Sequence, residues 1–438
     1  MTRHREVELL AIGAGPSNLA LAAALDELAP NDLAKNSLLI ERGDTVAWQR
    51  GMLLPWTQAQ VSFVKDLATM RNPRSRFSFL NYLHSVGRLD DFVNLGTFTP
   101  YRTEISEYLQ WAANSLTAVR VEYDRECVGI EPRYDVANVL TGWRTRLADG
   151  STIGSRFLSI GVGRDPHVPA ALAGVPARRL IHSTQYLPRI DELSKDLPYH
   201  VAVIGGAQSA AEMLYAVQQD LPNCQATMVM RSIGLNNYES SKFTNELYYS
   251  SFTDDFFNAR PQAREQLLRE MHRTNYSGLA PALLDALYRQ RYQDRLAGRQ
   301  RMQIVTMTDV TGARTDNEGV VLELTDRKNG AIRELRCDLV LLGTGFEPEM
   351  PAAIRRLGDE LGLEKLRVTR EYRLVTEGPA TAACYLQGVN EATHGIADSL
   401  LSVLARRASE ITADLLSIRG GADTTEPRDE VSVVTVRR

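Results

Sequence analysis

The chain has 438 residues, which is enough for two or three domains with large cores. A hydrophobic content of 44% and a charged content of 24% are typical of a globular protein, and a net charge of −4 gives no reason to expect nucleic acid or an anionic membrane as a partner. No uncharged apolar run is long enough to cross a bilayer, and no secretory h-region precedes the first strand-like segment. We therefore expect a cytoplasmic protein.

Cysteine spacing bears on the redox class of the protein. The four cysteines stand far apart and form no Cys-x-x-Cys pair: Cys127, Cys224, Cys337 and Cys384. Because a zinc knuckle, a disulfide scaffold and a redox-active dithiol each need paired cysteines, this spacing argues against all three. We expect free thiols and no bound metal.

A Gly-rich turn follows the first apolar, strand-like segment, residues 7–12. It reads Gly13-Ala14-Gly15-Pro16-Ser17-Asn18 and runs into a helix-forming stretch rich in Leu and Ala. A strand, a turn of this kind and a helix together predict a pyrophosphate site at the helix N-terminus. Asn18 stands where the usual pattern has a third glycine, so we expect its bulkier side chain to interact locally.

The next strand-like segment, residues 37–40, ends in an acid. Glu41 lies about 20 residues beyond the turn, where a ribose-binding carboxylate is expected. Glu41 is therefore a candidate for binding the ribose hydroxyls of an adenosine. The alternative is a solvated acid at the end of a strand.

A second Gly-rich turn follows the apolar segment 201–204. It reads Gly205-Gly206-Ala207-Gln208-Ser209-Ala210 and again opens a helix-like stretch. The strand-like segment after it ends in Arg231-Ser232 instead of an acid, and a cation with a hydroxyl suits a 2′-phosphate. The sequence thus favours NADPH over NADH, although Arg231 can also be read as a surface residue. Two dinucleotides in one chain indicate an enzyme that passes electrons between them.

Two strand-like segments that run into glycines, residues 156–166 and 337–346, are what the hinges of an inserted domain require. We therefore predict an α/β fold with two Rossmann-like dinucleotide-binding domains, the second inserted in the first, plus a smaller helical substrate region. The predicted boundaries are 1–190 and 346–420 for the first domain, 195–235 and 302–345 for the second, 236–301 for a helical insertion, and 421–438 for a disordered tail.

These motifs resemble, in order and over residues 7–412, the N-hydroxylating flavoprotein monooxygenases of siderophore biosynthesis. The resemblance lies in the first turn with its helix and in the segments 60–67, 71–73, 79–83, 275–277, 387–395 and 398–402. It is closest to the L-ornithine N5-monooxygenases. The lysine N6-hydroxylases differ more in residues 60–67.

The resemblance implies FAD in the first domain and NADPH in the second. NADPH would reduce the flavin, dioxygen would form a C4a-hydroperoxide, and the substrate amine would attack its distal oxygen. The FAD-binding residues would be Gly13, Gly15, Pro16, Asn18, Glu41 and Gln60, and the NADPH-binding residues Gly205, Gln208, Ser209, Arg231 and Asn275.

The same resemblance assigns the substrate site. Lys65 and Asn245 would hold the α-carboxylate of the amino acid, Asn275 would orient the reacting amine, and Ser402 would line the amine end. Gln60 would lie near the reacting edge of the flavin, and Gln60 and Asn275 are the catalytic candidates. Ala59 replaces a methionine common in the family, and Ala397 replaces Ser or Thr.

Each of these residues has a plainer interpretation. Lys65 beside Asp66 can be a surface ion pair, Asn245 and Asn275 can be helix caps or turn residues, and His394 can be structural.

A side-chain amine with a pKa near 10.4 is mostly protonated at pH ~8, so neutral amine costs about 3 kcal/mol. A pocket that offers amides to the amine and a cation to the far carboxylate lowers that cost.

Other functions stay open at this stage. The same chemistry on L-lysine, putrescine or cadaverine is the nearest alternative, although a diamine has no carboxylate for Lys65. An NADPH oxidase or a non-catalytic sensor is more remote, and a pyridine-nucleotide disulfide reductase would need a dithiol. The family also suggests a homo-oligomer, such as a tetramer.

Overall fold

The computed structural model describes residues 4–276, 278–421 and 432–433. Its helices are α1 Pro16–Leu28, α2 Asn31–Lys35, α3 Phe79–Ser85, α4 Leu89–Leu95, α5 Arg102–Asn114, α6 Tyr186–Asp191, α7 Gln208–Asp220, α8 Lys242–Glu246, α9 Ser250–Asn258, α10 Pro261–Asn275, α11 Pro281–Leu296, α12 Ala352–Glu360, α13 Glu391–His394 and α14 Leu404–Arg419. Its strands are β1 His4–Ile12, β2 Ser37–Ile40, β3 Arg120–Glu122, β4 Cys127–Tyr134, β5 Leu140–Leu147, β6 Thr152–Ile160, β7 Leu180–His182, β8 His200–Ile204, β9 Gln225–Val229, β10 Met302–Val305, β11 Thr308–Thr315, β12 Val320–Asp326, β13 Ile332–Cys337, β14 Leu339–Leu342, β15 Arg367–Val368, β16 Ala383–Leu386 and β17 Ser432–Val433.

The first sheet contains the strand before the first Gly-rich turn. Its order is β3-β2-β1-β6-β5-β4, and β16 also pairs with β6. β1 runs parallel to both β2 and β6. Residues Leu9–Ile12 of β1 are all buried because α1, α5 and α14 cover one face of the sheet and α12 covers part of the other. This parallel core carries the first turn at its carboxyl edge.

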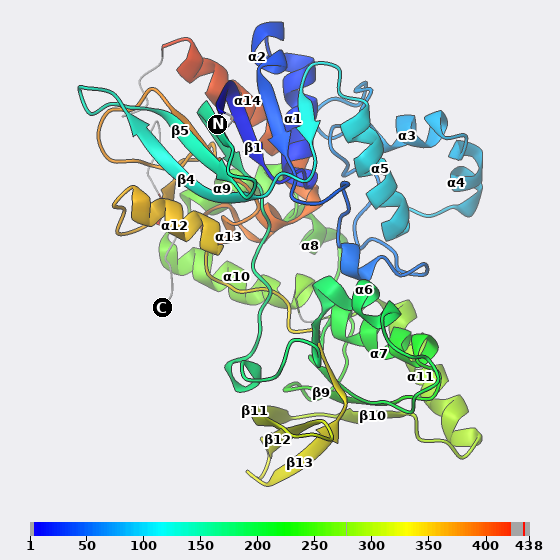
Figure 1. Cartoon of the computed structure of the whole chain (residues 1–438). Coiled ribbons are helices and arrows are strands. Elements are labelled where there is room, and N and C mark those ends of the chain that lie inside the picture. The colour runs from blue at the N-terminus through cyan, green and yellow to red at the C-terminus, as the bar shows by residue number, and fades with distance from the viewer. Residues whose placement is uncertain (1–3, 277, 422–431, 434–438) are drawn as a thin grey trace.

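The second sheet has the order β10-β9-β8-β14-β7, with every pairing parallel. Residues of α7 and α11 pack on one face, and the antiparallel sheet β11-β12-β13 packs on the other. This three-stranded sheet was not predicted from the sequence. Figure 1 shows the mixed first sheet and the parallel second sheet in separate lobes, which confirms the predicted two-lobe α/β fold.

Two extended segments connect the lobes (Figure 1). They pair with each other through an antiparallel bridge between Pro166 and Phe346, and the Glu347 amide donates to the Asp165 carbonyl over 2.8 Å. β7 pairs with β14 in the second sheet, so the chain enters this lobe before residue 180, earlier than the boundary predicted at 190. A three-residue strand is too short to reveal its sheet from sequence.

The predicted insertion 236–301 contains α8 to α11. Its residues Tyr248 and Met271 share an apolar cluster with Ile396, Ala397 and Val403, so the insertion packs on the C-terminal part of the first lobe. The predicted tail, 421–438, lies largely outside the described residues, apart from Gly421 and β17, which pairs with β15. Among the helices described, none combines the length and apolar character needed to span a bilayer.

Candidate active site

The first Gly-rich turn has the backbone geometry of a phosphate site. Gly13 has φ +86°, and a Cβ there would lie 2.8 Å from the Gly161 carbonyl oxygen, so only glycine fits. α1 begins at Pro16, and its N-cap residue Gly15 provides no side-chain cap. The amides at the N-terminus of α1, such as that of Ser17, therefore remain available for a pyrophosphate, and the site fits FAD.

Asn18 supports this turn from behind. Its amide nitrogen donates to the carbonyls of Ile12 and Gly13 over 2.9 and 2.7 Å. Its amide oxygen accepts from Ser159 Oγ and Gln387 Nε2, both at 2.8 Å. Asn18 is completely buried, so the predicted local role of this side chain is confirmed. Its direct contact with a cofactor stays a prediction.

Asn18→Ala is expected to destabilise the protein by about 2–4 kcal/mol, because it leaves several buried polar groups without partners at about 1–3 kcal/mol each. Denaturant unfolding of the flavin-free protein measures this loss. Asn94→Ala, at an exposed position of α4, is the control and should change stability little. Equal stability of the two variants would contradict the supporting role of Asn18.

Glu41 follows β2 directly and faces the first turn. Its two carboxylate oxygens accept hydrogen bonds from the amides of Ala14, at 2.9 Å, and Gly43, at 3.0 Å. The carboxylate thus joins the two loops between which an adenosine ribose would lie. The position fits the predicted role, and the ribose contact itself stays a prediction.

The second turn has the same design. Gly205 has φ +134°, and a Cβ there would lie 2.4 Å from the Gly343 carbonyl oxygen. Gln208 is the first residue of α7, whose N-cap lacks a side-chain cap, and Ser209 is half-buried beside it. Arg231 is exposed just beyond β9, and Ser232 Oγ lies 3.0 Å from the Cβ position of Gly206. These residues fit a phosphorylated dinucleotide.

Lys65 meets Ser402, 337 positions away in the chain. Lys65 Nζ donates to Ser402 Oγ over 3.3 Å and lies 4.5 Å from the centroid of the Tyr249 ring. The resemblance predicts Lys65 at the carboxylate end of the substrate and Ser402 at its amine end, so this direct contact does not fit the predicted separation, and Tyr249 was not predicted. Burial lowers the pKa of the Lys65 ammonium below its usual value.

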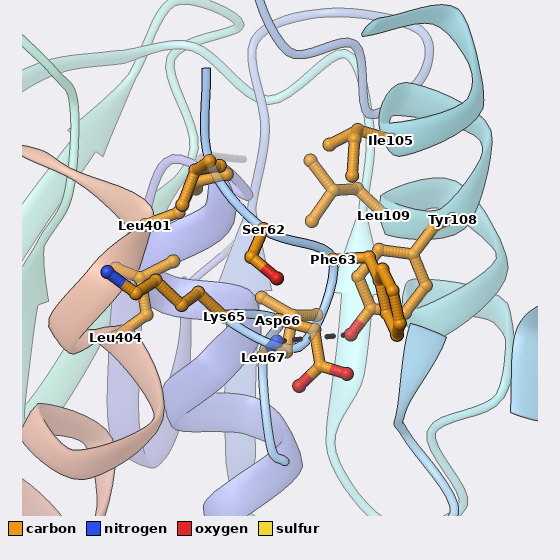
Figure 2. A pocket seen from close by; sticks show the side chains of 11 residues that line it. Ser62, Phe63, Lys65, Asp66, Leu67, Ile105, Tyr108, Leu109, Leu401 and Leu404 are labelled. Atoms are coloured by element: carbon orange, nitrogen blue, oxygen red, sulfur yellow. Dashed lines mark hydrogen bonds between the residues drawn. The ribbon is translucent and has the colours of Figure 1, made fainter. Parts of the chain in front are cut away.

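Asp66 does not pair with Lys65, so the plainer interpretation of this residue as part of a surface ion pair is wrong. The Asp66 carboxylate accepts from the amides of Ala68, Thr69 and Phe79, at 2.9, 2.6 and 2.8 Å, and from Thr69 Oγ1 at 2.6 Å. Figure 2 shows Lys65 directed toward Leu401 and Leu404, away from the Asp66 carboxylate. Among the described residues, no carboxylate forms an ion pair with Lys65.

A mostly apolar pocket adjoins the loop that carries Lys65 (Figure 2). It holds about 290 Å³ of empty space, part of it open to solvent. Its lining comes from this loop, from α5, from the turn before α14 and from the first residue of α14: Val61, Ser62, Phe63, Lys65, Asp66, Leu67, Ile105, Tyr108, Leu109, Leu401 and Leu404. Lys65 provides the only positive charge among these lining residues.

The two asparagines of the predicted site lie on neighbouring segments. Asn245 is exposed in α8, and Asn275 is the half-buried last residue of α10. Tyr248 and Thr274 join these segments through a hydrogen bond between their hydroxyls. Both segments pack against residues 396–403, next to Ser402. The arrangement places all four predicted substrate residues in one region, and the contacts of both asparagines with substrate stay predictions.

Gln60 is exposed directly after Ala59, which is buried in the first core. Ala397, the other departure from the family pattern, is buried among the residues that support Ser402. Neither alanine disturbs the local fold. The position of Gln60 near the flavin stays a prediction.

His394 has a structural role. It is buried and stacks on Tyr372 with ring centroids 4.1 Å apart, and burial lowers its pKa to about 4. Its ring nitrogens lie within hydrogen-bonding distance of Thr393 Oγ1 and the Arg370 carbonyl oxygen. The four cysteines are free, and among the described residues no cluster of His, Cys, Asp and Glu suits a metal ion.

A fully buried ion pair, which the sequence analysis missed, fixes the first turn from the C-terminal side. Arg407 Nη1 donates to Asp398 Oδ1 over 2.7 Å, and Arg407 Nη2 donates to Ser17 Oγ over 2.8 Å. The other Asp398 oxygen accepts from the Asn390 amide at 2.7 Å. The sequence signal for this ion pair was an arginine on the apolar face of α14, because a buried arginine needs a partner of opposite charge.

Comparisons with known proteins agree with this geometry. A protein-family model described as L-lysine 6-monooxygenase/L-ornithine 5-monooxygenase matches residues 5–348. The chain belongs to this family. An L-ornithine N(5)-oxygenase of Arthrobotrys oligospora is 38% identical over 431 residues, which cover 93% of this chain and 88% of the relative.

Two solved structures of family members are also similar to this chain. The ornithine hydroxylase PvdA from Pseudomonas aeruginosa has a TM-score of 0.88 and 36% identity, covering 95% of this chain and 100% of that one. The ornithine N-hydroxylase KtzI from Kutzneria sp. 744 has a TM-score of 0.88 and 33% identity over the same shares of the two chains. The resemblance and the fold predicted from the motifs are therefore confirmed.

Proposed function

We propose that this flavin-dependent monooxygenase N-hydroxylates the side-chain amine of L-ornithine, with NADPH as reductant and dioxygen as oxidant. The observation that carries the proposal is the half-buried Lys65 ammonium, which contacts Ser402 and Tyr249 and forms no ion pair with a carboxylate among the described residues. Such a cation suits the α-carboxylate of an amino acid. The relatives named above act on ornithine, and one structure contains reduced FAD, NADP⁺ and L-ornithine.

Bound FAD, reduced by NADPH, supplies the oxygen activation. The chain itself contributes binding and placement: the two Gly-rich turns hold the cofactors, and Lys65 holds the carboxylate end of the substrate. A protonated amine has no lone pair to react. Because the positive charge of Lys65 disfavours a second positive charge nearby, it lowers the pKa of the substrate amine and favours its neutral form. We expect the side-chain oxygen of Asn275 to accept the hydrogen bond that orients this amine, and the apolar wall of the pocket to limit access of water.

The decisive experiment supplies purified enzyme, NADPH and oxygen with L-ornithine, L-lysine, putrescine or cadaverine. N5-hydroxyornithine as the fastest-formed product supports the proposal. Faster turnover of L-lysine or a diamine would reassign the substrate. NADPH consumption that yields only hydrogen peroxide with every amine would instead indicate an oxidase.

Arg231→Ala is expected to raise the Michaelis constant for NADPH about tenfold and to leave that for NADH unchanged, since a hydrogen bond to a charged group is worth about 1.5 kcal/mol or more. Steady-state kinetics with both coenzymes measure the difference. Arg333→Ala, at an exposed position of β13, is a control for general loss of positive charge. Equal effects on NADPH and NADH would argue against a phosphate contact.

We further infer that the hydroxylated ornithine serves a hydroxamate siderophore or a related natural product. A cytoplasmic location and a homo-oligomeric state, such as a tetramer, stay predictions from the sequence and the family.

A further inference from the structure

A buried ion pair joins the two lobes. Arg102, at the start of α5, donates from Nη1 and Nη2 to the two carboxylate oxygens of Glu212 in α7, over 2.8 and 2.7 Å. α5 packs in the core of the first lobe and α7 in the core of the second. The side chains are 8% and 1% exposed, so water screens this pair very little.

The same carboxylate fixes the start of the NADPH-binding helix. Gln208, the first residue of α7, donates from Nε2 to Glu212 Oε1 over 2.7 Å. Gln208 Oε1 in turn accepts from the Ala280 amide at 2.9 Å, just before α11. Arg102 therefore acts through Glu212 on Gln208, a residue of the second Gly-rich turn.

The backbone around Arg102 also belongs to this interface. The Arg102 amide donates to the Thr57 carbonyl over 2.9 Å, and the segment before Thr57 enters the second core through Met52 and Leu54. A Cβ on Gly51 would lie 2.3 Å from the carbonyl oxygen of Thr184, so the lobes touch there backbone to backbone. This segment of the first lobe leads directly to Gln60, the residue predicted at the flavin edge.

We propose that the Arg102–Glu212 pair is a positioning device that sets the distance between the NADPH-binding turn and the flavin, and so controls hydride transfer. The inference rests on the proposed function. In this step the hydride passes with both electrons from the dihydronicotinamide to the oxidised flavin and leaves NADP⁺. Such transfer needs reacting atoms within about 3–3.5 Å, and a misplacement of about 1 Å costs about 100-fold in rate.

Arg102→Met tests the proposal in the FAD-loaded enzyme. Under anaerobic conditions, the loss of flavin absorbance after mixing with NADPH gives the rate constant of reduction at saturation and the Kd for NADPH. We expect the rate constant to fall by about 10- to 100-fold with little change in Kd, because the binding turn is intact but displaced. Arg102→Lys keeps the charge and loses the two-point contact. Its rate constant of flavin reduction should lie between those of Arg102→Met and the unchanged enzyme.

A second measurement bypasses hydride transfer. The flavin is reduced with dithionite, then mixed with NADP⁺, ornithine and oxygen, and the hydroxylated product of one turnover is measured. Arg102→Met should form as much product as the unchanged enzyme, which separates a displaced lobe from general damage. If the unchanged enzyme formed no product here, the proposed function would fail, whatever the variants do in the reduction step.

Arg314→Met is the matched control, because Arg314 and Glu334 form a two-point ion pair inside the three-stranded sheet with both side chains more than half exposed. It should leave both measurements unchanged. The proposal is overturned if Arg102→Met reduces its flavin at the normal rate, or if it loses as much product in the bypass turnover as in NADPH-driven turnover. Should Arg102→Met not fold, Arg102→Lys and Glu212→Gln apply the same two criteria.

Discussion

Lys65→Met is expected to raise the KM for L-ornithine by about 10- to 100-fold, since hydrogen bonds to charged groups contribute about 1.5–3 kcal/mol and each 1.4 kcal/mol is about tenfold. Methionine fills nearly the same volume, so the apolar wall formed with Leu401 and Leu404 should persist. Steady-state turnover with varied ornithine measures the change. Anaerobic flavin reduction by NADPH without ornithine should stay normal.

Putrescine provides the sharpest control for Lys65→Met, because it has the amine but no carboxylate. Its KM should not rise, because a second ammonium group gains nothing from a nearby cation, and an equal rise in KM for putrescine and ornithine would show that Lys65 acts on something other than the carboxylate. Lys65→Arg keeps the charge and should retain more affinity for ornithine than Lys65→Met.

The pH dependence of kcat/KM gives a further readout on the same residue, since it reports ionisations of the free enzyme and free substrate. Burial lowers the pKa of Lys65 from its usual 10.5, so its proton is lost, and carboxylate binding with it, at a lower pH than for an exposed lysine. In Lys65→Arg this alkaline decline should disappear, because the guanidinium stays protonated. Deprotonation of ornithine affects both enzymes equally, so the difference between their pH profiles reports on Lys65.

Arg407→Met is expected to lower the free energy of unfolding by about 3–5 kcal/mol, because it leaves a buried carboxylate without its partner. Arg407 and Asp398 are both fully buried, and Arg407 also holds Ser17 in the first turn of α1. The purified variant should therefore carry less FAD and unfold at a lower temperature. Flavin absorbance per protein and thermal unfolding measure the two effects.

The neighbouring residue provides the control for Arg407→Met. Arg406 forms an exposed i,i+4 pair with Glu410 at 3.3 Å, which should contribute about 0.5 kcal/mol or less. Arg406→Met should keep normal flavin content and stability. Full flavin content in Arg407→Met would contradict the link from Asp398 to the first turn, whereas failure to fold would agree with the expected loss.

Features that repeat locally in the chain could be predicted from sequence. Gly13 and Gly205 each follow a buried strand and open a helix, so both turns were visible as strand, turn and helix. Glu41 was found through its spacing from the first turn. Neither the sequence nor the resemblance predicted Lys65 beside Ser402, since the resemblance assigns them to opposite ends of the substrate.

Contacts between distant segments could not be predicted. Arg102 and Glu212 look like ordinary charged helix residues, and only the packing of α5 against the second lobe buries them together. β7 has three residues, too few to show whether it pairs with the first or the second sheet. The sheet β11-β12-β13 was missed because its strands do not alternate regularly between buried and exposed residues, and β12 begins with three consecutive buried residues.

The paired linkers at Pro166 and Phe346 have a consequence for engineering. Because the chain leaves and re-enters the first lobe at adjacent points, residues 167–345 form a cassette whose two ends meet, the geometry that tolerates exchange between proteins. A chimaera that receives this cassette from a relative would acquire a different coenzyme preference through two splice points. Arg102 lies outside this cassette and Glu212 lies inside it. Chimaeras whose donor cassette has a glutamate at the position of Glu212 should therefore be more active than those whose cassette lacks it.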